Sequence, residues 1–307
     1  MQIGGVDLCV SGAQVGHMSY ARFRPMIESA SARPALWRVI AGLCTVLAIT
    51  VFWALGLFLL VAALTGGAAS GLFGAADSPL ATLVFLLLIV GLGLGTWVAG
   101  RLWQGRSLGD LIGRGARTLR DFVLTALVTW AIAGALWALT LPFSDPLEQN
   151  LPFQQWLSWL PVALIAILLQ TGSEEVLFRG YLQSQLAARF SATWVWLLVP
   201  SLLFGALHYL PGETMGPGLI YVASTTLFGV IAADLTARSG SIGAAWGLHF
   251  ANNCLAILII VYVGAASGLG LYSAGTIEDA LSLSPLLIVD VLVLVLLWLV
   301  IRRLVTG

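Results

Sequence analysis

The chain has 307 residues, of which 59% are hydrophobic and only 9% are charged, and its formal net charge is zero. A soluble domain carries roughly 25% charged residues, so this chain lacks the polar groups needed to cover a water-facing globule. All 14 basic residues are Arg, and no long basic block suits a phosphate backbone, which excludes nucleic acid as an expected partner. The expected solvent is the lipid bilayer.

Apolar runs long enough for a spanning helix, about 20 residues, recur along the chain. We place spanning helices at 37–64, 80–99, 122–142, 154–178, 193–209, 219–237, 241–262 and 284–301. A membrane barrel would instead show short segments of period-two alternation. The predicted fold class is therefore all-α, a polytopic transmembrane bundle of about eight spanning helices.

Four parts follow from this division of the chain. They are a cytoplasmic N-terminal segment at 1–35, N-terminal transmembrane helices at 36–150, a core with the chemically active motifs at 151–265, and a C-terminal transmembrane helix at 266–307.

The Arg residues predict the orientation, because short cytoplasmic loops are enriched in Lys and Arg. With eight crossings and both termini in the cytoplasm, every Arg falls in or beside a cytoplasmic segment. The loops on the other side hold acidic residues and no Arg: Asp77, Asp145, Glu148, Glu213, Glu278 and Asp279. The exclusive use of Arg also indicates a GC-rich coding sequence and a bacterial source. We therefore expect the inner (plasma) membrane, with both termini cytoplasmic.

Ionisable groups inside lipid are costly, so those within spans are functional candidates by default. They are few: Glu174, Glu175, Arg179, His208, Asp234, His249 and Asp290. Glu175 and Arg179 lie four apart and can pair on one helix face, whereas Glu174 points about 100° away and has no local partner. A structural charge network accounts for Glu175 and Arg179, but it leaves Glu174 unexplained.

Two histidines share the expected depth of this glutamate. Glu174 lies 17 residues before Ser191 and His208 lies 17 residues after it, so a hairpin turning there would bring both to one level. His249 and Asn253 are four apart and share a face of the seventh span. One carboxylate, two imidazoles and a carboxamide are sufficient to activate water and to stabilise an oxyanion.

A metal site is the alternative chemistry, with Glu174, His208 and His249 as ligands and water at the open position. The chain has no HExxH zinc motif, and its three Cys are scattered without a CxxC pair. It also has no GxSxG motif, so water is favoured over a side chain as the nucleophile.

At these residues the sequence resembles the CPBP family, the CAAX protease and bacteriocin-processing membrane proteins that include the type II CAAX prenyl endopeptidases. The family pattern is EExxxR, then FxxxH, then HxxxN or HxxxD. It is matched in order by Glu174-Glu175 with Arg179, by Phe204 with His208, and by His249 with Asn253. The resemblance covers about residues 155 to 265.

The resemblance implies an intramembrane endopeptidase that hydrolyses a peptide bond of a membrane-associated or lipidated peptide or protein. In that family pattern Glu174 and His208 activate water, and His249 and Asn253 form the oxyanion site. Glu175, Arg179 and Phe204 would support them. The cofactor stays open between a divalent metal such as zinc and none. The expected partners are the peptide or protein substrate and the lipid bilayer.

Two other classes of protein compete with this hypothesis. A proton-coupled transporter could also use intramembrane Glu and His residues, and Asp290 in the middle of the eighth span would suit it. Such transporters often contain an inverted repeat, which this sequence lacks. A non-catalytic membrane scaffold or immunity protein could keep the same residues without using them.

Overall fold

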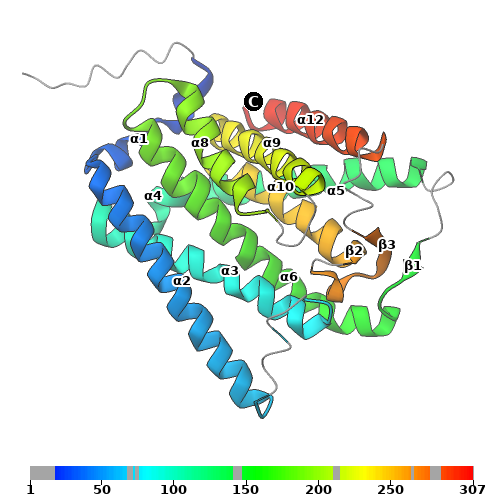
Figure 1. Cartoon of the computed structure of the whole chain (residues 1–307). Coiled ribbons are helices and arrows are strands. Elements are labelled where there is room, and N and C mark those ends of the chain that lie inside the picture. Colours follow the sequence, from blue (N-terminus) through cyan, green and yellow to red (C-terminus); the bar gives the residue numbers. More distant parts are fainter. Residues whose placement is uncertain are drawn as a thin grey trace, which may run out of the picture.

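The computed structural model describes residues 18–67, 72, 76–140, 147–209, 215–263, 266–276 and 285–306. The described residues form an α-helical bundle (Figure 1), which confirms the predicted fold class. The loop residues Asp145, Glu213, Glu278 and Asp279, and residues 1–17 of the predicted N-terminal segment, lie outside the described residues.

Each of the eight predicted spans overlaps a helix of the structure. The corresponding helices are α2 (Leu36–Leu64), α3 (Pro79–Ala99), α5 (Gly115–Thr140), α6 (Phe153–Glu175), α8 (Thr193–Ala206), α9 (Met215–Ser239), α10 (Gly243–Cys254) and α12 (Pro285–Thr306). Within the described residues, five helical stretches are long and apolar enough to cross a membrane, and those at 193–206 and 243–259 are shorter. The number of crossings therefore stays a prediction.

Several of these helices continue into π-helical segments, in which the backbone is wound more loosely. Helix α3 continues through η3 (Gly100–Gln104), α6 through η5 (Val176–Gln183) into α7 (Ser184–Ala187), and α10 through η6 (Leu255–Ile259). π-Helical turns occur frequently at functional sites. Here η5 follows directly on the Glu174-Glu175 pair and contains Arg179.

A small sheet, which the sequence analysis did not predict, lies at one end of the bundle (Figure 1). It contains β1 (Glu148–Gln149), β2 (Ile260–Val263) and β3 (Tyr272–Thr276) in the order β1-β3-β2, with β1 antiparallel and β2 parallel to β3. The 3₁₀ turn η7 (Ser267–Leu269) connects β2 to β3. The seventh predicted span continues to residue 262, but helical structure ends at Ile259, where the sequence Ile-Val-Tyr-Val favours a strand.

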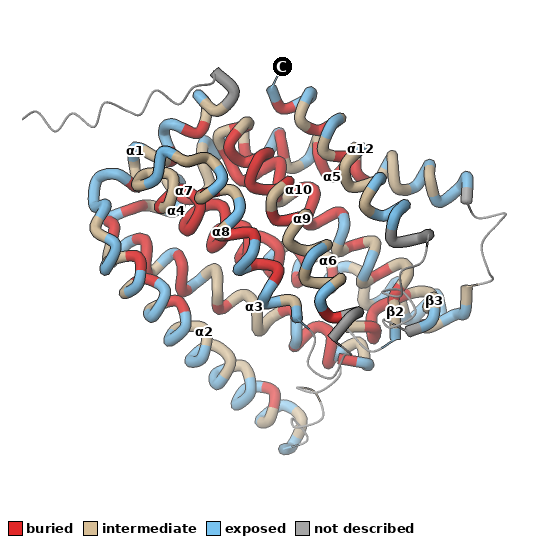
Figure 2. The backbone as a smooth tube through the Cα atoms, turned by 45° about the horizontal axis from the view of Figure 1, so that its top comes forward, coloured by how far each residue is buried: buried red, intermediate tan, exposed pale blue. Residues whose placement is uncertain are grey.

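Burial agrees with the arrangement expected in lipid, because many large apolar side chains are exposed and polar side chains are buried together with an apolar core. Buried residues concentrate on α6, α9 and α10 (Figure 2), whereas α2 is largely exposed. Phe52 and Leu64 of α2 are 72% and 76% exposed. Gln170 and Gln183, on the continuous α6–η5 helix, are buried. A soluble bundle would instead cover its surface with many polar and charged side chains.

Helix α3 packs closely on α2 through small residues, as is common for membrane helices. A Cβ atom at Gly91 would lie 2.9 Å from the Thr50 Cα, and one at Gly95 would lie 2.8 Å from the Val46 Cα. These distances are shorter than side-chain contacts allow, so a larger residue at either position would separate the two helices.

The N-terminal segment is docked on the bundle by η1 (Met18–Phe23) and α1 (Arg24–Ser31). The Tyr20 hydroxyl donates to Asp234 Oδ1 at 2.7 Å, and Arg238 Nε and Trp298 Nε1 each donate to Asp234 Oδ2 at 2.8 Å. Burial, followed by the hydrogen bond to Asp234, raises the pKa of Tyr20 to about 12, so the phenol remains a donor at neutral pH. Asp234 therefore has a structural role, joining η1, α9 and α12.

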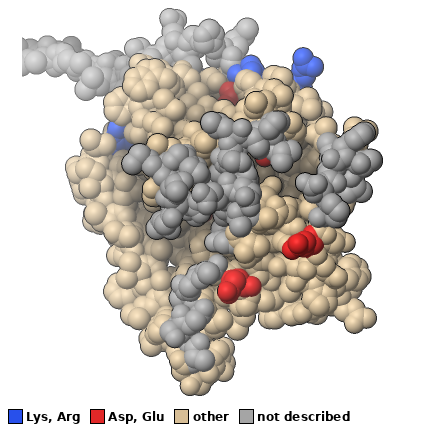
Figure 3. All heavy atoms as spheres, turned by 45° about the vertical axis from the view of Figure 1, so that its right-hand side comes forward, with Lys and Arg blue, Asp and Glu red and all other residues tan. Residues whose placement is uncertain are grey.

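Charged side chains are distributed unevenly along the bundle. On the face seen in Figure 3, the visible Arg side chains lie toward the end that carries the C-terminus, and the larger acidic patches lie farther from it. This distribution agrees with the Arg pattern used above to predict the orientation, which itself stays a prediction.

Candidate active site

Two helices, α6 and α10, hold the two acids and one of the histidines in the interior of the bundle. Glu174 and Glu175 end α6 and are 7% and 0% exposed, and His249 of α10 is 3% exposed. Burying charged groups this deeply is costly unless they are paired, so their partners determine what the cluster can do.

Glu175 forms the pair predicted from its spacing to Arg179. Arg179 NH1 lies 3.0 Å from Glu175 Oε1, and both side chains are buried. Arg179 also donates from NH2 to the Gly229 carbonyl at 3.3 Å, and its guanidinium lies 4.7 Å from the Phe204 ring centroid. Arg179 thus connects η5 to α8 and α9 and compensates the charge of one glutamate.

His249 lies between the two glutamates. Its Nδ1 is 2.8 Å from Glu175 Oε1. Because a carboxylate paired with Arg can only accept, Nδ1 of His249 is the donor in this contact, which fixes the orientation of the ring. The other ring nitrogen, Nε2, then lies 3.4 Å from Glu174 Oε2.

Glu174 keeps a buried carboxylate oxygen without a hydrogen bond. The 3.4 Å separation from His249 is an ion-pair distance, but Glu174 Oε2 has no hydrogen-bond partner of good geometry. The sequence analysis expected Glu174 to lack an Arg partner, and within the described residues its ion-pair contact is to His249. Glu175 Oε2 also has no hydrogen-bond partner, but Glu175 is held through Oε1 by both Arg179 and His249. Glu174 has no Arg partner, so it is the better placed of the two carboxylates to accept a proton.

His208 adjoins the cluster through an aromatic ring. It follows the end of α8, and its Nδ1 lies 2.8 Å from the Phe204 carbonyl oxygen. The Phe204 ring lies 4.5 Å from the His208 ring and 5.8 Å from the His249 ring, measured between centroids. Over the part of the chain that the structure describes, no hydrogen bond or ion pair joins His208 to Glu174. The expected juxtaposition of His208 and Glu174 therefore stays a prediction, and the contact with Glu174 that the structure shows is made by His249.

Asn253 occupies the next turn of α10 after His249. Its Nδ2 donates to Gln170 Oε1 at 3.0 Å, and Gln170 is buried one turn before Glu174 on α6. The sequence analysis missed Gln170. A signal was present, because Gln170 follows the uncharged stretch 160–169 and lies four residues before Glu174, on the same helix face.

The other ionisable candidate in the spans, Asp290, lies apart from this cluster on an exposed position of α12.

Glu174, His208 and His249 also do not fit the three-ligand metal site that was left open from the sequence. Within the described ranges, no three His, Cys, Asp or Glu side chains converge as a metal site requires.

The fold and site together define an α-helical integral membrane protein that holds two adjacent carboxylates against a histidine within its bundle. Residues 154–255 match the sequence model of the family described as Type II CAAX prenyl endopeptidase Rce1-like. This match confirms the resemblance to the CPBP family over a segment that includes Glu174, His208, His249 and Asn253. At the level of the family, it supports a CAAX-type intramembrane protease.

A curated protein of Bacillus subtilis (strain 168), "Uncharacterized protein YyaK", is 35% identical to this chain over 115 residues. The aligned segment spans 37% of this chain and 37% of that relative. No solved structure matches the chain.

Proposed function

We propose that this protein is an intramembrane endopeptidase that hydrolyses a peptide bond of a membrane-associated or lipidated peptide or protein. The observation that carries the proposal is the buried arrangement of Glu174, His249 and Glu175. Glu175 orients His249 and pairs with Arg179, whereas Glu174 has no Arg partner. We further propose the inner membrane of a bacterium as its location, with both termini in the cytoplasm, on the distribution of Arg along the sequence.

In the proposed reaction, Glu174 is the general base. It takes a proton from a water molecule as the water oxygen attacks the carbonyl carbon of the substrate, and His208 assists in orienting that water. When the tetrahedral intermediate collapses, protonated Glu174 returns the proton to the leaving nitrogen. The products are a carboxylic acid and an amine, and Glu174 is again a carboxylate.

The negative oxygen of the intermediate would be held by His249 and Asn253. Both side chains lie on one face of α10, and each is oriented by a partner on α6, Glu175 for His249 and Gln170 for Asn253. The role of His249 requires a hydrogen on Nε2 as well as on Nδ1. Donors that are held in place before the reaction stabilise developing charge at little reorganisation cost.

Supporting roles follow from the same contacts. Glu175 positions His249 and is itself held by Arg179. Phe204 packs between His208 and His249 and lies under the Arg179 guanidinium, so it sets the distance between the two histidines.

The test is cleavage of a membrane peptide by purified variants. Glu174→Gln keeps the shape of the side chain and removes the proton-accepting carboxylate, so it should fold, bind the peptide and fail to cleave it. His208→Ala should also be inactive, whereas Asn253→Ala should lose about 10²–10³-fold in kcat, as expected for one oxyanion donor. Glu28→Gln, at an exposed position on α1, is the matched control and should cleave normally. Full cleavage by Glu174→Gln would eliminate the general-base assignment.

A further inference from the structure

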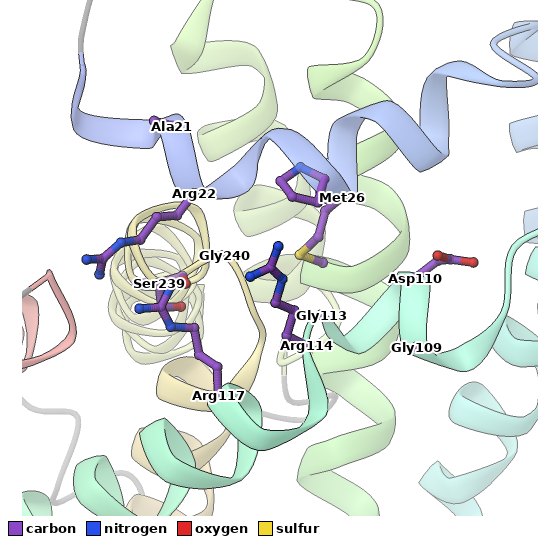
Figure 4. A pocket seen from close by; sticks show the side chains of 11 residues that line it. Ala21, Arg22, Met26, Gly109, Asp110, Gly113, Arg114, Arg117, Ser239 and Gly240 are labelled. Carbon is purple, nitrogen blue, oxygen red and sulfur yellow. Dashed lines mark hydrogen bonds between the residues drawn. The ribbon is translucent and has the colours of Figure 1, made fainter.

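A cavity separate from the candidate active site is lined by several Arg residues. A cavity of about 460 Å³, a volume in the range of small-molecule sites, is bordered by the N-terminal segment, the junction of α4 (Leu108–Ile112) with α5, and the turn between α9 and α10. Its lining includes Arg22, Arg114, Arg117 and Asp110, and it contains no residue of the candidate active site (Figure 4).

The basic residues of this cavity are not neutralised by the acid beside them. Both the backbone N–H and the hydroxyl of Ser107 donate to Asp110 Oδ2 at 2.7 Å, so Asp110 is engaged in capping α4. The nearby buried Asp121 does not line the cavity and lies 3.3 Å from Arg120 NH1. It also interacts electrostatically with Arg117 and Arg22, so it offsets part of their charge. The lining therefore carries three Arg and one Asp, and positive charge remains in excess when Asp121 is counted as well.

The hydrogen-bond partners of Arg22 and Arg117 are neutral carbonyl groups. Arg22 donates to the carbonyl oxygens of Val305 and Thr306 at 2.6 and 3.0 Å, and Arg117 donates to the Ser239 carbonyl at 3.3 Å. Arg114 is exposed, and no side-chain hydrogen bond or ion pair is found for it in the part of the chain that the structure describes. The carbonyl contacts orient the guanidinium groups of Arg22 and Arg117 without cancelling their charge.

Two glycines that line the cavity allow the backbone segments around it to pack closely. Gly113 and Gly240 have φ angles of 90° and 77°, in the left-handed region where other residues are strained. A Cβ atom at Gly240 would collide with the Arg22 carbonyl oxygen, and the Ile242 N–H donates to the Ile112 carbonyl at 3.1 Å across the same junction. The cavity is thus formed by close backbone packing and is organised before any ligand arrives.

We infer that this cavity binds a phosphate group, supplied either by the headgroup of an anionic lipid or by a soluble phosphorylated molecule. Guanidinium groups pair with phosphate through paired N–H donors. The inference is independent of the proposed peptidase activity, because the cavity lining includes no residue of the active-site cluster.

The experiment measures the Tm of the full-length protein in detergent during titration with phosphatidylglycerol, phosphatidylcholine or glycerol 3-phosphate. A phosphate site predicts that phosphatidylglycerol, glycerol 3-phosphate or both raise the Tm. Stabilisation by the lipid alone identifies a headgroup as the source, and stabilisation by glycerol 3-phosphate identifies a soluble molecule. Phosphatidylcholine, with its compensating cation, should act more weakly.

Two variants separate this site from general attraction of anions. Arg114→Gln, alone and together with Arg117→Gln, should keep the Tm of the parent without ligand and bind the active ligand about tenfold more weakly. Arg24→Gln removes an Arg that is 77% exposed and lies outside the cavity, so its titration should match the parent. The inference is overturned if neither anionic ligand raises the Tm, or if the double variant and the parent give equal titrations. If the double variant has a lower Tm than the parent without ligand, the test rests on Arg114→Gln alone. That single variant must then bind the active ligand more weakly than the parent.

Discussion

Removing Arg179 tests how the buried charges are held. Its guanidinium is the cation paired with Glu175, and the two side chains are 2% and 0% exposed. In Arg179→Ala, Glu175 keeps its contact with His249 and loses its compensating positive charge. The substitution also removes the hydrogen bond to the Gly229 carbonyl and the packing of the guanidinium on Phe204.

The expected loss of stability is about 3–5 kcal/mol, the usual result when one partner of a buried ion pair is deleted. The exposed pair Arg24–Glu28, 3.9 Å apart, provides the matched control, and Arg24→Ala should cost about 0–1 kcal/mol. Because Glu175 still orients His249, Arg179→Ala should lower the folded yield in detergent more than it lowers activity per folded molecule.

Unfolding by a denaturing detergent, followed together with peptide cleavage, measures both quantities. The double variant Glu175→Gln with Arg179→Met keeps an oxygen near His249 and removes both charges, so it should recover much of the lost stability. Normal thermal stability of Arg179→Ala with complete loss of cleavage would refute this reasoning and would assign Arg179 to substrate binding or catalysis.

Three further predictions concern the partners of Asn253, the N-terminal segment and the topology. Gln170→Leu removes the acceptor that orients Asn253, so kcat should fall by up to about 10²–10³-fold with KM little changed. Gln170→Glu keeps an acceptor oxygen at this position, so it should retain most of the parent rate. Tyr20→Phe should cost about 1–2 kcal/mol in thermal unfolding, because Asp234 keeps its other two donors, and an unchanged Tm would show that η1 is not held by this bond. Reporter fusions at Gly307 and in the 101–120 loop should both give a cytoplasmic signal, and an external signal at either position would contradict the eight-span topology.

The parts of this structure that depend on local spacing were predictable from the sequence. The spans follow from apolar runs, and the Glu175–Arg179 pair follows from a spacing of four residues on one helix. The contact between Glu174 and His249 was not predictable in this way, because it depends on how α6 and α10 pack. The strands at 260–263 and 272–276 were missed for a related reason, since an apolar run by itself does not distinguish a strand from the end of a helix.

The contacts between α6 and α10 also constrain the topology. Gln170 meets Asn253, and Glu174, one turn farther along α6, meets His249, one turn earlier along α10. Contacts that advance on one helix and recede on the other show that the two helices run in opposite directions. In an eight-span chain they are the fourth and seventh spans, which must cross the membrane in opposite directions. Both contacts use a spacing of four residues, about 6 Å along a helix, so sliding one helix by a single residue would weaken both. The candidate active site therefore helps to set the register of the helices that carry it.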